Sequence, residues 1–191
     1  MDKLWWYTAR ASGLVAWALL AAGVIWGLLL SGKIVRSRPR PAWVVDLHRF
    51  LGAAGLVFVG IHVTTIMLDS YVDFSPLQVL VPLASSWHPV AVAWGIVAAY
   101  LMVAVEVTSL LRARLSVRAW RMTHFLSFPV YVSATTHLLS AGTDRHSVVV
   151  RVAVLAVTVA VAILAAVRVG SAARPHGGPS TPAPARVRVG A

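Results

Sequence analysis

The stretch HRFLGAAGLVFVGIH, residues 48–62, sets two histidines at the ends of a run that is otherwise almost wholly apolar. It lies within an apolar segment over 47–68, and about 20 such residues suffice for a helix to cross a bilayer. On a helix, a 14-residue separation corresponds to a rise of about 21 Å and a difference in direction of about 40°. His48 and His62 are therefore expected on one helix face, one near each membrane surface.

The composition supports a membrane location for the whole chain. Of its 191 residues 59% are hydrophobic and only 12% are charged, whereas soluble domains carry roughly 25% charged residues. Four further apolar segments lie at 11–30, 89–111, 122–141 and 147–169. We therefore predict an all-α bundle of five transmembrane helices over 1–170. The remainder, 171–191, is rich in Pro, Gly, Ala and Arg and is predicted to be a disordered tail.

The basic residues predict the orientation of the chain. Segments 31–46 and 112–121 each carry four Lys or Arg, while segment 69–88 carries none. Because cytoplasmic loops are enriched in Lys and Arg, we expect the N-terminus outside and the C-terminus in the cytoplasm, with the chain crossing the plasma membrane several times. Topology and contact with lipid explain the net charge of +11 without invoking nucleic acid.

A second pair of histidines lies in the fourth apolar segment. His124 and His137 are 13 residues apart, a rise of about 20 Å that nearly matches the first pair. An ideal helix would point their rings roughly 140° apart. Pro129 lies between them and can kink the helix. Ionisable residues within membrane spans are rare and usually functional.

With both helices running outward, the four histidines fall at two depths. His48 and His124 form a cytoplasmic-side pair, and His62 and His137 form an outer pair. Two imidazoles at each depth suit two b-type hemes, and bis-histidine iron has no open position, which favours electron transfer. A hydrogen-bonded core role is the alternative for any single histidine. A metal transporter would require carboxylates or Met beside the histidines, and the only carboxylate within the spans is Glu106, far along the third span.

Other residues are candidates to complete the heme sites. Gly52 and Gly55 share the face of the two histidines and could leave a groove for a macrocycle, or let helices pack closely. Arg49 and Arg121 could bind propionates at the cytoplasmic level, and Arg10 could serve the outer heme. The alternative for each arginine is an ordinary side chain reaching the membrane surface.

These features resemble the transmembrane domain of the ferric reductase and NADPH oxidase family. That family carries heme histidines 14 apart on one helix and 13 apart on another, in the order found here. The segment WRMTH at 120–124 is similar to the family's aromatic-Thr-His start, and TARA at 8–11 is similar to its Ala-Arg-Ala beside the outer heme. The resemblance covers about residues 8–169.

The resemblance implies stepwise electron transfer through an inner and then an outer heme, as the membrane heme subunit of an oxidoreductase. The chain has no Gly-rich dinucleotide motif, so a separate flavoprotein or a quinol is expected to exchange electrons with it. A quinol-linked cytochrome b and a heme-free transport or assembly protein are the rival hypotheses. Polar residues expected near the outer level could bind a ferric complex or a partner, or be ordinary loop residues; they are Asp69, Tyr71, Asp73, His88, Asp144 and His146.

Overall fold

The computed structural model describes residues 3–31, 42–70 and 72–173. Several residues used above therefore lie outside the described part of the chain. They are Lys33, Arg36, Arg38 and Arg40 of the first basic segment, Tyr71, and the tail from residue 174 onward.

The described chain folds into helices, as the all-α prediction requires. Four of them are long and apolar enough to cross a membrane: α1 (Lys3–Ser31), α2 (Ala42–Leu68), α4 (Pro89–Leu110) and α7 (Val148–Ala173). These four correspond to four of the five expected spans. The last helix continues to Ala173, past the point at which the tail was expected to begin.

The expected continuous helix over 122–141 is wrong in detail, because the chain forms two helices there. They are α5 (Val117–His124) and α6 (Ser127–Ala141), joined by a tight turn at Phe125 and Leu126. Pro129 has no N–H to donate to the carbonyl of Phe125 four residues earlier. That carbonyl instead accepts a hydrogen bond from the Phe128 N–H at 3.2 Å, a tighter 3₁₀-type turn. The break thus falls between the two histidines.

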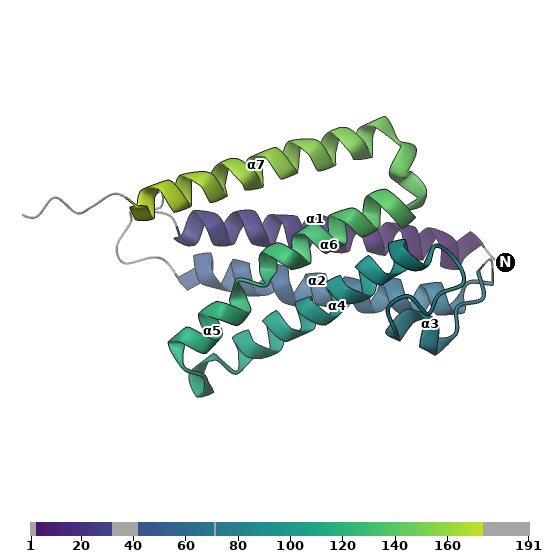
Figure 1. The fold of residues 1–191 in the computed structure, drawn as a ribbon, viewed down its shortest axis with the longest axis horizontal. Coiled ribbons are helices and arrows are strands. Elements are labelled where there is room, and N and C mark those ends of the chain that lie inside the picture. The colour runs from purple at the N-terminus through teal and green to yellow at the C-terminus, as the bar shows by residue number, and fades with distance from the viewer. Residues whose placement is uncertain (1–2, 32–41, 71, 174–191) are drawn as a thin grey trace, which may run out of the picture.

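Short elements connect the long helices. The segment between α2 and α4 contains the five-residue helix α3 (Pro76–Leu80). A 3₁₀ turn, η1 (Arg112–Arg114), leads from α4 to α5, and another, η2 (Thr143–His146), leads from α6 to α7. In Figure 1, α3 lies at the end of the bundle where α1 begins, and α5 lies at the opposite end. We call these the α3 end and the α5 end.

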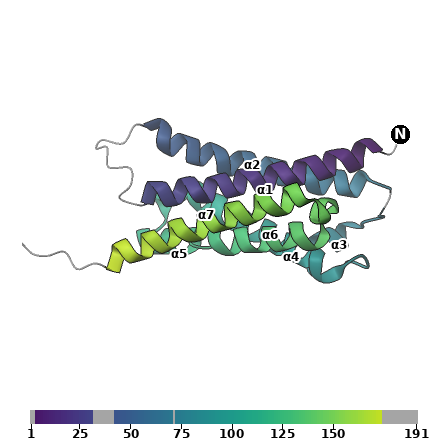
Figure 2. The ribbon, with the colours of Figure 1, turned by 90° about the horizontal axis from the view of Figure 1, so that it is seen from above.

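The helices pack as two close pairs that meet more loosely. α1 packs extensively on α2, and α4 on α6, whereas α2 and α4 touch sparsely. Figure 2 shows α1 and α2 on one side of the bundle and α4, α5 and α6 on the other. A buried core of Ala21, Val24 and Leu28 of α1 with Tyr131 and Val161 holds α6 and α7 against α1.

The outer surface of the bundle is strongly apolar. On α7, Leu155 is 64% exposed, Val152 59% and Ile163 57%. Apolar side chains repeated along a helix in this way would be unfavourable in water, but they match the hydrocarbon core of a bilayer. The protein is therefore a helical membrane protein.

Candidate functional site

At the α3 end, the rings of His62 and His137 lie side by side across the loose interface. Their centroids are 6.3 Å apart and their planes are inclined by 77°. Nδ1 of His62 donates to the Ala9 carbonyl of α1 at 2.7 Å, and Nδ1 of His137 donates to the Ala91 carbonyl of α4 at 2.8 Å. A carbonyl can only accept, so each Nδ1 carries the proton and each Nε2 keeps a free lone pair.

At the α5 end, the rings of His48 and His124 form a second pair. Their centroids are 5.9 Å apart and their planes are inclined by 71°. Neither Nδ1 has a hydrogen-bond partner; the Gly23 carbonyl faces that of His48 but lies outside hydrogen-bond geometry. The Trp120 indole stacks on His124 with 5.2 Å between centroids. The arrangement brings together the same partners that the depth argument pairs.

The spacing of both pairs fits a heme iron between the rings. A metal-bound imidazole has a metal–nitrogen distance of about 2 Å, which puts its ring centre about 3 Å from the metal. Two axial imidazoles therefore have ring centres about 6 Å apart, as both pairs do. The His62 ring of α2 is hydrogen-bonded to α1, and the His137 ring of α6 is hydrogen-bonded to α4. The two rings face each other where these two helix pairs meet loosely.

Three glycines that the sequence reasoning missed lie directly against these rings. A Cβ added to Gly13 would lie 2.9 Å from His62, one at Gly27 would lie 3.2 Å from His48, and one at Gly95 would lie 2.8 Å from His137. A side chain at Gly13 or Gly95 would thus clash with the ring it faces.

A signal for two of these glycines was present in the sequence. Gly13 and Gly27 are 14 residues apart, as His48 and His62 are. Their order is reversed along the chain, as antiparallel packing of α1 on α2 requires. Each carbonyl that faces a histidine Nδ1 belongs to the residue four before a glycine, at Ala9, Gly23 and Ala91.

Gly52 and Gly55 face α4 side chains in this structure. A Cβ at Gly52 would clash with Oε1 of Glu106, and one at Gly55 would lie 2.9 Å from Cε of Met102. Glu106, which was considered only as a metal ligand, is thus the group packed closest to Gly52. The role of these glycines beside a macrocycle stays a prediction.

The three candidate arginines have different surroundings. Arg10 forms an ion pair with Asp144 of η2 and lies 5.3 Å from the Trp6 ring centre. Arg49 is exposed and lies 3.6 Å from Asp46, and Arg121 is exposed at the α5 end. Their roles at propionates stay predictions.

The Arg10–Asp144 pair links α1 to the turn after α6. Ala9, beside Arg10, accepts the His62 hydrogen bond, and α6 carries His137. The ion pair thus connects α1, which accepts the His62 hydrogen bond, to the turn that follows α6, which carries His137. Of the other expected outer residues, His146 accepts a hydrogen bond from Arg145 at 3.0 Å, and His88 borders a groove described below.

Comparison with known families identifies the class of protein that carries this arrangement. Residues 12–135 match the model of the ferric reductase like transmembrane component. The match covers well over half of the chain, so the chain belongs to this family of membrane proteins, whose transmembrane domains generally bind heme. No curated protein and no solved structure matches the chain. The family and the apolar helices together define a membrane protein of the electron-transfer class.

Proposed function

We propose that the protein carries electrons across the membrane through two b-type hemes, one held by His48 and His124 and one by His62 and His137. The observation that supports this most directly is the pair of ring separations, 5.9 and 6.3 Å, at two depths of one bundle. Heme supplies reversible one-electron chemistry at its iron. Two histidines bound to each heme iron would leave no open position there, which would favour electron transfer over binding of oxygen or substrate at the metal.

The chain's own groups would tune the two sites. Nδ1 hydrogen bonds to Ala9 and Ala91 hold the α3-end rings in one tautomer and make their Nε2 atoms better donors to a metal. At the α5 end, stacking on Trp120 takes the place of such a bond for His124. Arg49 and Arg121 are the propionate partners that we propose for the α5-end heme, and Arg10 is the one for the α3-end heme.

The sides of the membrane that the two heme sites would face follow from the orientation that the basic loops predict. We propose that the protein lies in the plasma membrane, with the α3 end facing outward and the α5 end facing the cytoplasm. This orientation rests on Arg112, Arg114, Arg118 and Arg121, which lie in or beside the described turn and helix at the α5 end, because Lys and Arg are enriched on the cytoplasmic side. We propose a flavoprotein or a quinol as the separate redox partner.

A reduced-minus-oxidised spectrum tests the proposal against the heme-free alternative. The protein is purified from a heme-replete host, with His88→Ala and His146→Ala as controls because these exposed histidines belong to neither pair. Wild type and both controls are expected to show the α and Soret bands of b-type heme. Replacing all four paired histidines by Ala should abolish the bands; a wild type without them would refute the proposal.

A further inference from the structure

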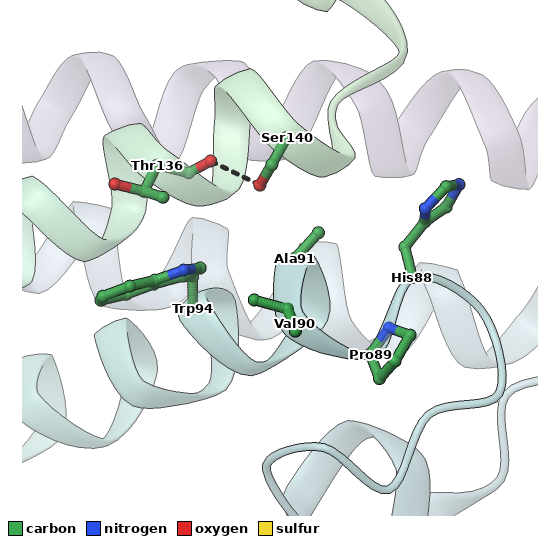
Figure 3. A pocket seen from close by; sticks show the side chains of 7 residues that line it. All are labelled: His88, Pro89, Val90, Ala91, Trp94, Thr136 and Ser140. Carbon is green, nitrogen blue, oxygen red and sulfur yellow. Dashed lines mark hydrogen bonds between the residues drawn. The ribbon is translucent and has the colours of Figure 1, made fainter.

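A groove opens beside the α3-end histidine pair, between the start of α4 and the end of α6. It has a volume of about 400 Å³ and is lined by residues 88–91 and Trp94 on the α4 side and by Thr136 and Ser140 on α6. Figure 3 shows these side chains around one hollow, with the hydroxyl of Ser140 donating a hydrogen bond to the backbone carbonyl of Thr136. Pockets that bind small molecules have volumes of about 300–1,000 Å³.

Some of the residues that line the groove also bind His137 or adjoin it in sequence. Ala91, whose carbonyl accepts the His137 hydrogen bond, lines the groove, and Thr136 precedes His137 in α6. Trp94 precedes Gly95, against which the His137 ring packs. Residues that line the groove therefore contact or directly adjoin the residues that hold the His137 ring, and the full width of a helix is about 10 Å. A redox-active molecule bound here would be close enough to exchange electrons with a heme on His137.

The lining suits a neutral ring with oxygen atoms at its edge. Pro89, Val90 and Ala91 are apolar, and Trp94 offers an aromatic face. The hydroxyls of Thr136 and Ser140 already donate to backbone carbonyls of α6, so their oxygens remain free to accept. His88 can donate or accept. None of the seven lining side chains is a carboxylate, an amine or a guanidinium, so the groove has no permanently charged group for a ferric chelate or a phosphate.

The groove opens toward the bilayer rather than toward the bundle interior. Val90 is 63% exposed and Trp94 is 39% exposed, and both belong to a helix able to span the membrane. They lie within the first two turns of α4, at the level where a bilayer changes from hydrocarbon to headgroups. His88 stands at the mouth in a left-handed conformation, with φ 42°, and packs edge-on against Trp87.

We propose that this groove binds the headgroup of a lipid-soluble quinone or quinol that exchanges electrons with the heme on His62 and His137. The inference rests on the proposed function, because only a heme at that level gives the ligand a redox partner. A quinol loses two O–H hydrogens as two protons and two electrons. The protons leave to water at the α3 end, and the electrons reduce two ferric irons, one each, leaving a quinone. The reverse reaction reduces a quinone.

Binding is tested on the full-length, heme-loaded protein in nanodiscs, with ubiquinone-2 and its quinol as probes. Dissociation constants come from equilibrium dialysis, and quinol-driven heme reduction from stopped-flow spectra. Trp94→Leu and Ser140→Ala are the groove variants, and we expect each to weaken binding, Trp94→Leu by about tenfold. Trp5→Leu is the matched control because Trp5 is 40% exposed at the same end, and it should bind as wild type does.

Each outcome is decisive because heme content is measured on the same samples. Heme-loaded wild type that does not bind ubiquinone-2, or a Trp94→Leu variant that binds it unchanged, overturns the groove proposal and leaves the proposed function intact. Competition by decanol as strong as that by the quinone would assign the groove to lipid chains. Competition by ferric citrate would assign it to a water-soluble acceptor. Wild-type protein that contains no heme would overturn the proposed function, whether or not it binds ubiquinone-2.

Discussion

The two histidine pairs are built alike in ring spacing and differently in what holds the rings. At the α3 end, both Nδ1 atoms donate to backbone carbonyls, and glycines let both rings approach the backbone. At the α5 end, both Nδ1 atoms lack a partner, and His124 rests against Trp120. The α3-end rings are therefore held by hydrogen bonds as well as by packing, whereas the α5-end rings are held by packing alone. The difference predicts unequal sensitivity of the two sites to substitution.

The largest expected effect comes from removing a ligand at one end only. His62→Ala or His137→Ala should remove the α3-end heme and keep the other, because the pairs lie about 20 Å apart along the helices. His48→Ala or His124→Ala should do the reverse. Heme content per chain, measured with the pyridine hemochromogen assay, should fall by half in each case. Full content in any one of the four variants would contradict that ligand assignment.

The next largest effect is expected from substituting the glycines that pack against the histidine rings. Gly13→Ala and Gly95→Ala force a methyl group into a ring, and overpacking of this kind costs about 1–3 kcal/mol. We expect loss of much of the α3-end heme and a lower melting temperature. Gly27→Ala should have a smaller effect on the α5-end heme because its Cβ would lie 3.2 Å from the His48 ring.

Gly60→Ala is the control for the glycine variants. It lies in α2 near His62 but has nothing within 4 Å of an added Cβ. It should bind heme as wild type does, and alanine is the better helix former. If Gly60→Ala lost as much heme as Gly13→Ala, the close contact between glycine and histidine ring would have no special role in heme binding.

The Arg10–Asp144 pair should act on the potential of the α3-end heme alone. Arg10→Ala removes a positive charge and should lower the midpoint potential of that heme, since a nearby positive charge favours the reduced iron. Asp144→Asn should raise it. A spectroscopic redox titration that resolves the two hemes measures both shifts. Shifts of equal size at both hemes, or shifts of the same sign in both variants, would contradict a local electrostatic role.

The smallest effect is expected from the aromatic stack at the α5 end. Trp120→Leu removes stacking on His124 and should weaken retention of the α5-end heme by about 0.5–1.5 kcal/mol. Trp120→Phe keeps an aromatic face and should retain most of it. Electron paramagnetic resonance, which reports the orientation of axial imidazoles, should change at one heme only. A changed signal from the α3-end heme would argue against this assignment.

Much of the fold could be predicted from hydropathy because length and apolarity alone define spanning helices. The break at Phe125 and Leu126 was the exception. Pro129 marked the place where it could occur, but a proline does not specify whether a helix bends or divides. The break explains the 140° mismatch of His124 and His137, because an ideal helix does not run from one to the other.

The site was predicted less completely than the fold. Pairing of the four histidines required only depth, which follows from residue spacing and helix direction. The surroundings of Gly52 and Gly55 required the rotation of α2 against α4, which spacing within one helix cannot supply. Gly13 and Gly27 could have been found by comparing spacings between antiparallel helices. Arg10 and Asp144 were both expected near the outer level, but nothing in a single sequence indicates that these residues, 134 apart, form an ion pair.

The central claim is that each chain holds two hemes, and their stoichiometry tests it most directly. Heme is quantified by the pyridine hemochromogen method and protein by amino-acid analysis, on wild type purified from a heme-replete host. The account predicts two b-type hemes per chain, each lost with its own histidine pair. A ratio of one or zero heme per chain would contradict it.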